Sequence, residues 1–447
     1  MNPVLMLFAA VLMVAQLVLP RRFAFVPLMV AVSQFQSAPV IQVGVSFTTW
    51  KLVILAGLFR AMRERTFSFS LRQPLDLLIA LWSGWIILSG FAHHPTDHNP
   101  ITIRLSMIFD FAGSYLYARS FIQDRDDILR FAKCLALVML PLAFEAIAEK
   151  AMHKNFYTMI AGTEQWVEIR GGRVRAAGPF SHPILLGTFA ATSMILLGSL
   201  WYEDRRRMLV GAGACAVVVL CSGSSGPIMT IFTGLMAIGL WRWRERLGLI
   251  RKCAIAGLIA LQLVMHAPVW YLMSRIDLAG GSTGWYRAAL IDTVVDHLSE
   301  WWLVGSDYTR HWLGSGVYWS KDQIDITNYY VGMGVTGGLL LLLLFLAILF
   351  RAFQLLGRGM TQLRLASDRD EFILWCVGAS LFAHCFAFVS VNYFDQSNAA
   401  LSLVLGTVPG LCGWSMARGA ASAEAPCQEE ANDPASMVSQ ECSDPCA

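Results

Sequence analysis

The sequence contains few charged residues. Only 15% of its 447 residues are Asp, Glu, Lys or Arg, and 56% are hydrophobic, whereas soluble domains carry about 25% charged residues. Apolar runs of about 17 to 22 residues recur along the chain, which is the length a helix needs to cross a bilayer. The composition therefore excludes an ordinary soluble domain. It predicts an all-α, polytopic membrane helical bundle.

Several chemical signatures are also missing. The two longest polar loops contain no cysteine, so we expect no disulfide framework in them. No Cys and His spacing is typical of a zinc site, and no Walker A sequence is present, so we expect no metal, no cofactor and no nucleotide-driven motor. His93, His94, Asp97 and His98 lie together in one loop, and we interpret them as ordinary loop residues. The lack of an internal repeat disfavours the duplicated transporter folds.

The apolar runs predict 12–13 transmembrane helices in a membrane domain of residues 1–416. We expect spans near residues 3–20, 23–37, 44–60, 74–92, 101–118, 131–149, 184–202, 208–222, 226–241, 253–270, 330–350, 372–392 and 398–416. The second span is weak, and the first lacks the features of a cleaved signal, so we expect it to be retained. Residues 417–447 are rich in Ala, Ser, Glu, Asp and Pro and predict a disordered, acidic cytoplasmic tail.

Lysine and arginine concentrate in alternate loops, which hold 23 of the 34 basic residues. The positive-inside rule places these loops in the cytoplasm. The intervening loops then face the other side, with residues 150–183 as a first periplasmic loop and residues 271–329 as a large periplasmic loop. Five ionisable residues fall inside predicted spans: Lys51, Arg104, Asp110, Glu145 and His384. We interpret them as interhelical locks such as a Lys51–Asp110 pair, the alternative being a polar route to a lipid-linked substrate.

The first outer loop ends in an arginine-rich segment beside the membrane. Arg170, Arg173 and Arg175 fall within six residues, are flanked by glycines and are followed by His182 and Pro183. Guanidinium groups bind phosphate oxygens in a bidentate manner, so this spacing favours a diphosphate ligand. Anchoring to outer lipid headgroups is the alternative.

The large outer loop combines charge with aromatic rings. Arg287 lies in the first turn of a predicted helix, where a cation opposes the helix dipole and is better explained by an anionic ligand at the same helix end. Asp325 and Asn328 lie one turn apart at the membrane mouth and can position a sugar hydroxyl or accept its proton. The glycines from Gly332 to Gly338 indicate close helix approach. Four tryptophans offer flat surfaces for sugar rings: Trp285, Trp301, Trp302 and Trp312.

In this order and topology, the motifs resemble the O-antigen ligase and polymerase superfamily over roughly residues 40–415. The similar pieces are Arg175-x-x-Gly-x-Phe-x-His182-Pro183, the turn Ser222–Gly226, an arginine-bearing outer-loop helix from Arg287 to Gly305-Ser-Asp307, and Gly334-x-x-Gly337. The resemblance implies a glycosyltransferase of the multi-span, lipid-donor type in a bacterial inner membrane, with its active face in the periplasm. It implies undecaprenyl-diphosphate-linked oligosaccharide as donor, with neither a nucleotide sugar nor an essential metal.

The same resemblance implies site roles. Arg175 and Arg287, with Arg173 as a third cation, are expected to bind the diphosphate, while Asp325, Asn328 or His182 would act on the attacking hydroxyl. Ligases of the family place a His, then Asn or Ser, eleven residues before the Gly-x-x-Gly, and this chain has Gln323 and Ile324 there.

This departure favours polymerisation of repeat units into exopolysaccharide or O-antigen. The alternatives are a ligase that transfers glycan to lipid A core or protein, and a polysaccharide or lipid flippase. Expected partners are membrane lipid and chain-length regulator or export proteins, and no nucleic acid is expected.

Overall fold

The described chain consists of helices, with two short β-hairpins at one end. The computed structural model describes residues 3–35, 39–43, 45–93, 99–161, 167–275, 284–314, 320–364 and 366–431. The first elements are α1 (Pro3–Val18), η1 (Arg21–Phe23), α2 (Phe25–Gln34), β1 (Ile41–Val43), β2 (Val45–Phe47), α3 (Thr49–Arg63), α4 (Pro74–Gly90), α5 (Pro100–Ile108), the π-helical η2 (Phe109–Gly113), α6 (Ser114–Phe121), α7 (Arg125–Met152) and α8 (Phe156–Ala161). The following elements are β3 (Glu168–Arg170), β4 (Arg173–Arg175), α9 (Pro183–Leu197), η3 (Gly198–Leu200), α10 (Arg205–Ser222), α11 (Ser225–Gly239), η4 (Leu240–Arg246), α12 (Leu247–Val264), η5 (Val269–Arg275), α13 (Gly284–Asp296), α14 (Leu298–Trp301), α15 (Tyr329–Leu363), α16 (Asp368–Ala387) and α17 (Gln396–Ala431).

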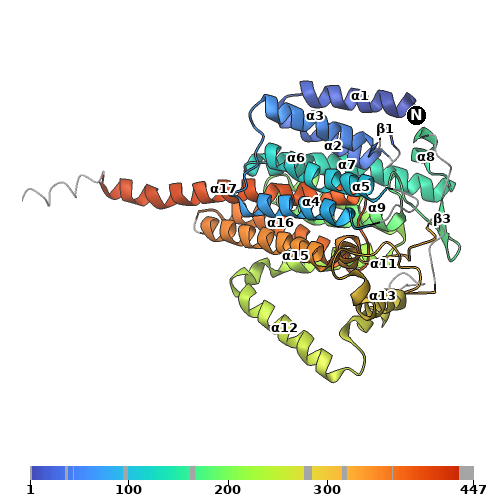
Figure 1. The fold of residues 1–447 in the computed structure, drawn as a ribbon. Helices are drawn as coiled ribbons and strands as arrows, with labels where there is room; N and C mark the ends of the chain where they lie inside the picture. Colours follow the sequence, from blue (N-terminus) through green and yellow to red (C-terminus); the bar gives the residue numbers. More distant parts are fainter. Residues whose placement is uncertain are drawn as a thin grey trace, which may run out of the picture.

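The predicted apolar spans form helices. Among the described residues, six helices are long and apolar enough to cross a membrane: α7, α9 with η3, the run from α11 through α12, α15, α16 and α17. The shorter helices α1 and α4 are also apolar, and the other predicted spans coincide with α2, α3, the α5–η2–α6 run and α10. Most of these helices run side by side in one bundle (Figure 1). The chain is therefore a polytopic helical protein.

Some predicted boundaries differ from the structure. The span expected at 44–60 begins with strand β2, because Val, Ser and Phe also suit a strand and apolarity alone does not separate the two. The weak second span is the ten-residue α2, and the span expected at 253–270 is α12, which begins earlier. Helix α17 continues past residue 416 to Ala431, where we expected disorder, since Ala and Glu are good helix formers. Residues 432–447 lie outside the described residues.

The basic turns gather at one end of the bundle. Arg125 contacts both Glu203 and Asp370, which joins the start of α7 to the turn before α10 and to the start of α16. Arg244 of η4 lies 3.0 Å from Asp368 in the same region. Alternate loops that the charge pattern assigns to one side of a membrane therefore share one end of the molecule.

A buried ion pair connects two of the helices. Lys51 Nζ of α3 lies 3.2 Å from Asp110 Oδ2 of η2, and both side chains are buried. The Trp50 indole donates to the other carboxylate oxygen of Asp110 at 3.0 Å. The predicted interhelical lock between Lys51 and Asp110 is confirmed.

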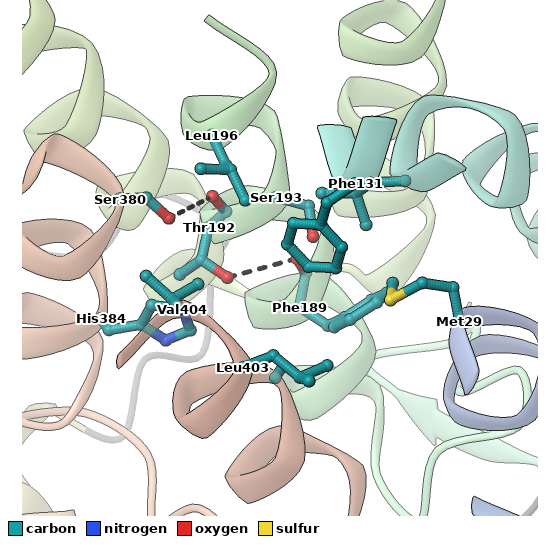
Figure 2. Close-up of a pocket in the computed structure, with 12 residues that line it drawn as sticks. Met29, Phe131, Phe189, Thr192, Ser193, Leu196, Ser380, His384, Leu403 and Val404 are labelled. Carbon is teal, nitrogen blue, oxygen red and sulfur yellow. Dashed lines mark hydrogen bonds between the residues drawn. The ribbon is translucent and has the colours of Figure 1, made fainter. Parts of the chain in front are cut away.

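A small pocket lies inside the bundle between α2, α7, α9, α16 and α17 (Figure 2). Its wall is mostly apolar, and most of its polar groups bond to neighbouring groups. Ser380 Oγ donates to the Thr192 carbonyl at 3.0 Å, and Thr192 Oγ1 donates to the Thr188 carbonyl at 3.0 Å. His384 Nδ1 lies 2.9 Å from the Tyr393 hydroxyl. The pocket is mostly apolar packing space in which three of the four polar lining side chains have a hydrogen-bond partner.

Helix α15 breaks at Gly337 and Gly338, and the outer-loop helix α14 docks against the break. Gly338 has φ 76° and ψ −175°, a conformation that only glycine adopts readily. The carbonyl groups freed by the break each accept a hydrogen bond: that of Val335 from the Ser306 N–H at 2.9 Å, that of Thr336 from Arg104 Nη2 at 2.8 Å, and that of Gly337 from Trp85 Nε1 at 2.7 Å. The break therefore fixes the large loop on the bundle.

Helix α12 diverges from the bundle (Figure 1). None of its residues is buried, and η4, which connects it to α11, contains a non-helical residue at Trp243 (φ −111°, ψ 21°). In a bilayer, lipid tails would cover such an apolar helix without any unsatisfied backbone group, since its hydrogen bonds are internal.

Candidate functional site

The β3–β4 hairpin places three arginines on one face. Its turn is Gly171–Gly172, and both glycines have positive φ (56° and 73°), as the tight hairpin turn that matches strand twist requires. The register pairs Arg170 with Arg173 and Glu168 with Arg175. Because side chains alternate along a strand, these four share one face, while Val174 is buried on the other.

Arg175 is the buried member of that face and is only 4% exposed. Its Nε donates to the Ser222 carbonyl at 3.2 Å, its Nη1 to Glu168, and its Nη2 to the Ser224 hydroxyl. Burial lowers the pKa of the Arg175 guanidinium, and the Glu168 carboxylate opposes this shift. Arg175 therefore fastens the hairpin to the turn between α10 and α11, where Gly223 leaves room for its side chain.

His182 is the N-cap of α9. Its Nδ1 accepts the Ile184 N–H at 3.2 Å, so the ring proton resides on Nε2, which lies 3.1 Å from Glu168 Oε2. Burial lowers the pKa of His182; Glu168 opposes this, and Arg175 adds to it. His182 Nδ1 is therefore occupied by the helix cap, and the predicted role of His182 at the attacking hydroxyl stays a prediction.

A pair of acids from α7 supports the turn between the hairpin and α9. The buried Glu149 carboxylate accepts the Ala177 and Gly178 N–H groups at 3.2 and 2.8 Å, and Asn155 Nδ2 donates to the Gly178 carbonyl at 2.8 Å. Glu145 lies directly beneath Gly178, where a Cβ would come 3.3 Å from its carboxylate. These contacts fix the backbone between Arg175 and His182.

Arg287 and Asp325 reach the same region from the large loop. The Tyr286 hydroxyl donates to the Asp325 carbonyl at 2.8 Å, which ties the start of α13 to the segment before α15. Arg287 Nε is buried, and no described residue accepts a hydrogen bond from it. Burial and the nearby Arg170 lower the pKa of Arg287, while Asp325 opposes them. Although Asp325 as a residue is exposed, protein atoms crowd its carboxyl group and raise its pKa, against the effect of Arg287.

The 150–183 loop and the large loop therefore form one charged site. Among the described residues it brings together four guanidinium groups and two carboxylates: Arg170, Arg173, Arg175, Arg287, Glu168 and Asp325. These six groups carry a formal excess of two positive charges, and Glu145 and Glu149 lie behind them under the Gly178 turn. The guanidinium groups supply the hydrogen-bond donors that a diphosphate requires.

The four tryptophans divide into two groups. Trp301 and Trp312 are buried in the core of the large loop, and their indoles donate to the Val294 carbonyl at 2.8 Å and to Glu300 at 2.9 Å. Their burial contradicts the predicted stacking on sugars. Trp285 and Trp302 are 64% and 50% exposed, so for them the sugar-binding prediction stays open.

Asn328 is a structural residue. Its Oδ1 caps α15 by accepting the Val331 N–H at 3.1 Å, and its Nδ2 lies 3.4 Å from the Val389 carbonyl. The residue is buried, so its amide faces the protein at both ends. Of the three predicted catalytic residues, Asp325 is the one carboxylate, and it lies near enough to Arg287 to affect its pKa.

The histidine-containing loop after α4 is docked on the large loop. His93 contacts Asp307 through Nδ1, and its Nε2 lies 2.8 Å from the Val304 carbonyl. These two contacts join the end of α4 to the segment after α14. His94, Asp97 and His98 lie outside the described residues.

Sequence reasoning missed one member of the site, Glu168, and named Arg170 only as part of the arginine-rich segment. The signal was the Gly171–Gly172 pair, because a two-residue turn of this type fixes the register and so pairs Glu168 with Arg175. No family model matches the chain, and no curated protein matches it. The function is therefore inferred from the residues of the charged site.

Proposed function

We propose that this chain is a membrane glycosyltransferase that joins lipid-diphosphate-linked oligosaccharide repeat units into a longer glycan. The main support is that Arg170 and Arg175 from one loop lie near Arg287 from another. Together these arginines give the site a positive charge. A buried guanidinium nitrogen with no described acceptor is suited to an anionic ligand.

In the proposed reaction, a hydroxyl at the non-reducing end of one lipid-linked unit attacks the anomeric carbon of another glycan. A carbon–oxygen bond forms there as the bond to the diphosphate oxygen breaks, and the electron pair leaves with the undecaprenyl diphosphate. Arg287 and Arg170 stabilise the charge that develops on the leaving group. The Asp325 carboxylate takes the hydroxyl proton.

Glu168 and Arg175 act at the diphosphate in this scheme. Glu168 holds Arg175 in the absence of donor, and an incoming phosphate offers the same guanidinium a stronger, bidentate partner. Exposed Trp285, next to Arg287 at the start of α13, is positioned to contact a sugar of the donor.

The test is reconstitution of the purified chain in liposomes with a defined undecaprenyl-diphosphate oligosaccharide and no nucleotide sugar. We expect glycans of two or more units with the wild type. Arg287→Ala should reduce the rate at least about 100-fold, the usual cost of removing one donor to a developing anion. Arg275→Ala, an exposed arginine before the same helix, is the matched control and should be unaffected.

Two outcomes would redirect the proposal. Failure of wild-type chain to lengthen the donor would reject polymerisation. Transfer of intact glycan to added lipid A core, without lengthening, would establish the ligase alternative.

A further inference from the structure

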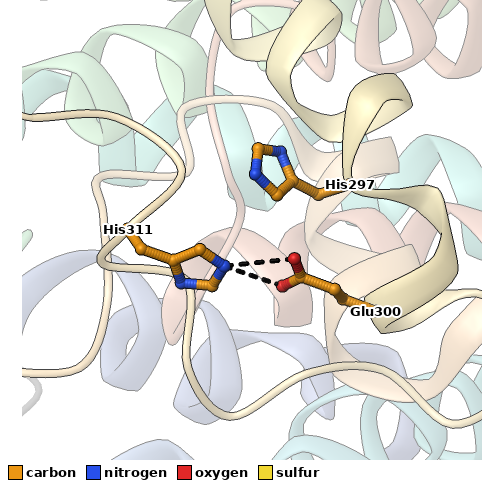
Figure 3. A group of neighbouring side chains, drawn as sticks. All are labelled: His297, Glu300 and His311. Atoms are coloured by element: carbon orange, nitrogen blue, oxygen red, sulfur yellow. Dashed lines mark hydrogen bonds and ion pairs between the residues drawn. The ribbon is translucent and has the colours of Figure 1, made fainter.

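Three side chains with metal-ligand chemistry gather in the large loop, apart from the arginine site. They are His297, Glu300 and His311, and one ligand atom from each lies within 4.8 Å of the other two (Figure 3). His297 follows the end of α13, ten residues after Arg287, which corresponds to about 15 Å along a helix. The cluster is therefore separate from the proposed diphosphate site.

The ring of His297 is held in the tautomer that a metal requires. Its Nδ1 lies 2.8 Å from the Thr293 carbonyl, and since a carbonyl only accepts, Nδ1 must carry the proton. The lone pair is then on Nε2. Histidine ligands in proteins commonly donate their second ring N–H to a backbone carbonyl in this way, because that bond orients the ring and raises its basicity.

The other two members are supported as well. His311 Nε2 lies 2.9 Å from Glu300 Oε2, and the Trp312 indole donates to Glu300 at 2.9 Å. Trp312 also stacks on the His297 ring at 5.4 Å with an interplanar angle of 24°, and Tyr308 stacks on the His311 ring at 5.1 Å and 13°. All three side chains are thus oriented by neighbours outside the cluster.

We propose that His297, Glu300 and His311 bind a divalent transition-metal ion of the Zn²⁺ class, with water completing the coordination. Two imidazoles and one carboxylate favour Zn²⁺ over Mg²⁺ or Ca²⁺, which prefer oxygen ligands throughout. Ligand atoms around tetrahedral zinc are about 3.4 Å apart. His311 Nε2 and Glu300 Oε2 are now 2.9 Å apart, so binding would release the proton between them, open this pair slightly and bring both toward His297. The ion would fasten the 308–313 segment to α14. This replaces the sequence-based expectation of a metal-free chain and does not depend on the proposed function.

The experiment uses the full chain purified with a tag that contains no histidine and stripped with a chelator. Zn²⁺ is titrated against a chromophoric competitor, and Co²⁺ is used as a spectroscopic probe of coordination geometry. We expect one ion per chain, visible absorption typical of tetrahedral Co²⁺, and a higher melting temperature with Zn²⁺. His297→Phe retains a ring to stack on Trp312 and should weaken Zn²⁺ binding more than about 100-fold, since even loss of an outer partner costs 10–100-fold.

Two further variants make the result decisive. Glu300→Gln keeps an acceptor for the Trp312 indole but removes the charge, and should also weaken binding, whereas His266→Ala, an exposed histidine outside the cluster, should not. Circular dichroism confirms that each variant is folded. Equal Zn²⁺ affinity in wild type, His297→Phe and Glu300→Gln, or no Zn²⁺ binding by the wild type, would overturn the assignment.

Discussion

Each of the three nitrogens of Arg175 donates to a protein acceptor, and Glu168 is the one charged acceptor among the three. Glu168→Gln keeps an oxygen for Arg175 but removes the charge that competes with a diphosphate. We expect the KM for the lipid-linked donor to fall roughly fivefold, equivalent to about 1 kcal/mol, which is the interaction of two unit charges about 4 Å apart in bulk water. Glu245→Gln at the opposite, basic end is the control. An unchanged KM in a normally folded Glu168→Gln variant would show that the carboxylate does not compete.

Asp325 gives the site a pH dependence whose sign follows from its surroundings. Desolvation raises the pKa of Asp325 above the ordinary aspartate value of 3.8, and Arg287 opposes this. A general base works only when deprotonated, so activity should fall as the pH falls through this raised pKa. Asp325→Asn should remove most of the activity, and the activity that remains should no longer fall at low pH. Initial rates measured across a range of pH test both expectations. A variant that retains a wild-type profile would exclude Asp325 as the base.

At this scale the sequence predicted residue types better than residue roles. Asp325 and Asn328 are both short polar residues before an apolar helix, and only the fold shows that Asn328 caps that helix while Asp325 lies near Arg287. Trp301 likewise cannot be separated from Trp302 by sequence, because the helical phase at α14 decides which ring is buried. Roles that depend on long-range contacts require the structure.

At the scale of elements, the break in α15 fixes the large loop. A Cβ at Gly338 would lie 2.3 Å from the Leu303 carbonyl, and its φ of 76° disfavours any other residue. Gly338→Ala should therefore destabilise the protein by about 2 kcal/mol or more and make the outer loop sensitive to protease. Gly357→Ala in the same helix has open space and should be neutral or stabilising by up to about 1 kcal/mol. Similar melting temperatures for the two variants would contradict this interpretation of the break.

The glycines of this segment show what local patterns predict well. Their spacing predicted close helix approach, and a Cβ at Gly334 would indeed lie 2.6 Å from the Trp301 ring. The sequence did not reveal that the helix opens at Gly337 and Gly338, because the donors that satisfy the freed carbonyls come from distant positions such as Trp85 and Arg104. The spacing of glycines within one helix predicts that another segment packs closely against it. Which segment packs there depends on the arrangement of the whole bundle.

The buried pair between α3 and η2 provides a second test of element packing. Lys51→Met leaves the Asp110 carboxylate buried without its cation and should cost about 3–5 kcal/mol. Adding Asp110→Leu removes the stranded charge, so the double variant should recover much of the loss, although the Trp50 indole then lacks its acceptor. Thermal unfolding in detergent measures each step. Additive losses in the double variant would show that the two residues do not act as a pair.

At the scale of the whole molecule, the alternation of basic and polar loops predicted which turns share an end. The structure gathers Arg125, Arg244 and their acidic partners at one end and the arginine hairpin with α13 at the other (Figure 1). The charge pattern predicts this arrangement because basic loops stay on the cytoplasmic side of a membrane. Successive helices run in opposite directions, so alternate loops lie at the same end of the bundle. Helix α12 shows the limit of the pattern, since its apolarity does not indicate that it stands away from the bundle.

This arrangement makes a topology prediction on which the proposed site depends. Ile169 and Val295 are exposed positions on the 150–183 loop and the large loop, and Arg206 is exposed in the first turn of α10. In a background with Cys253 and the tail cysteines replaced by serine, we expect a membrane-impermeant maleimide to label Ile169→Cys and Val295→Cys on intact cells. Arg206→Cys should react only after permeabilisation. If Ile169→Cys and Val295→Cys reacted from opposite sides, no single pocket could hold Arg175 and Arg287 around one diphosphate, because charged loops do not move across a bilayer.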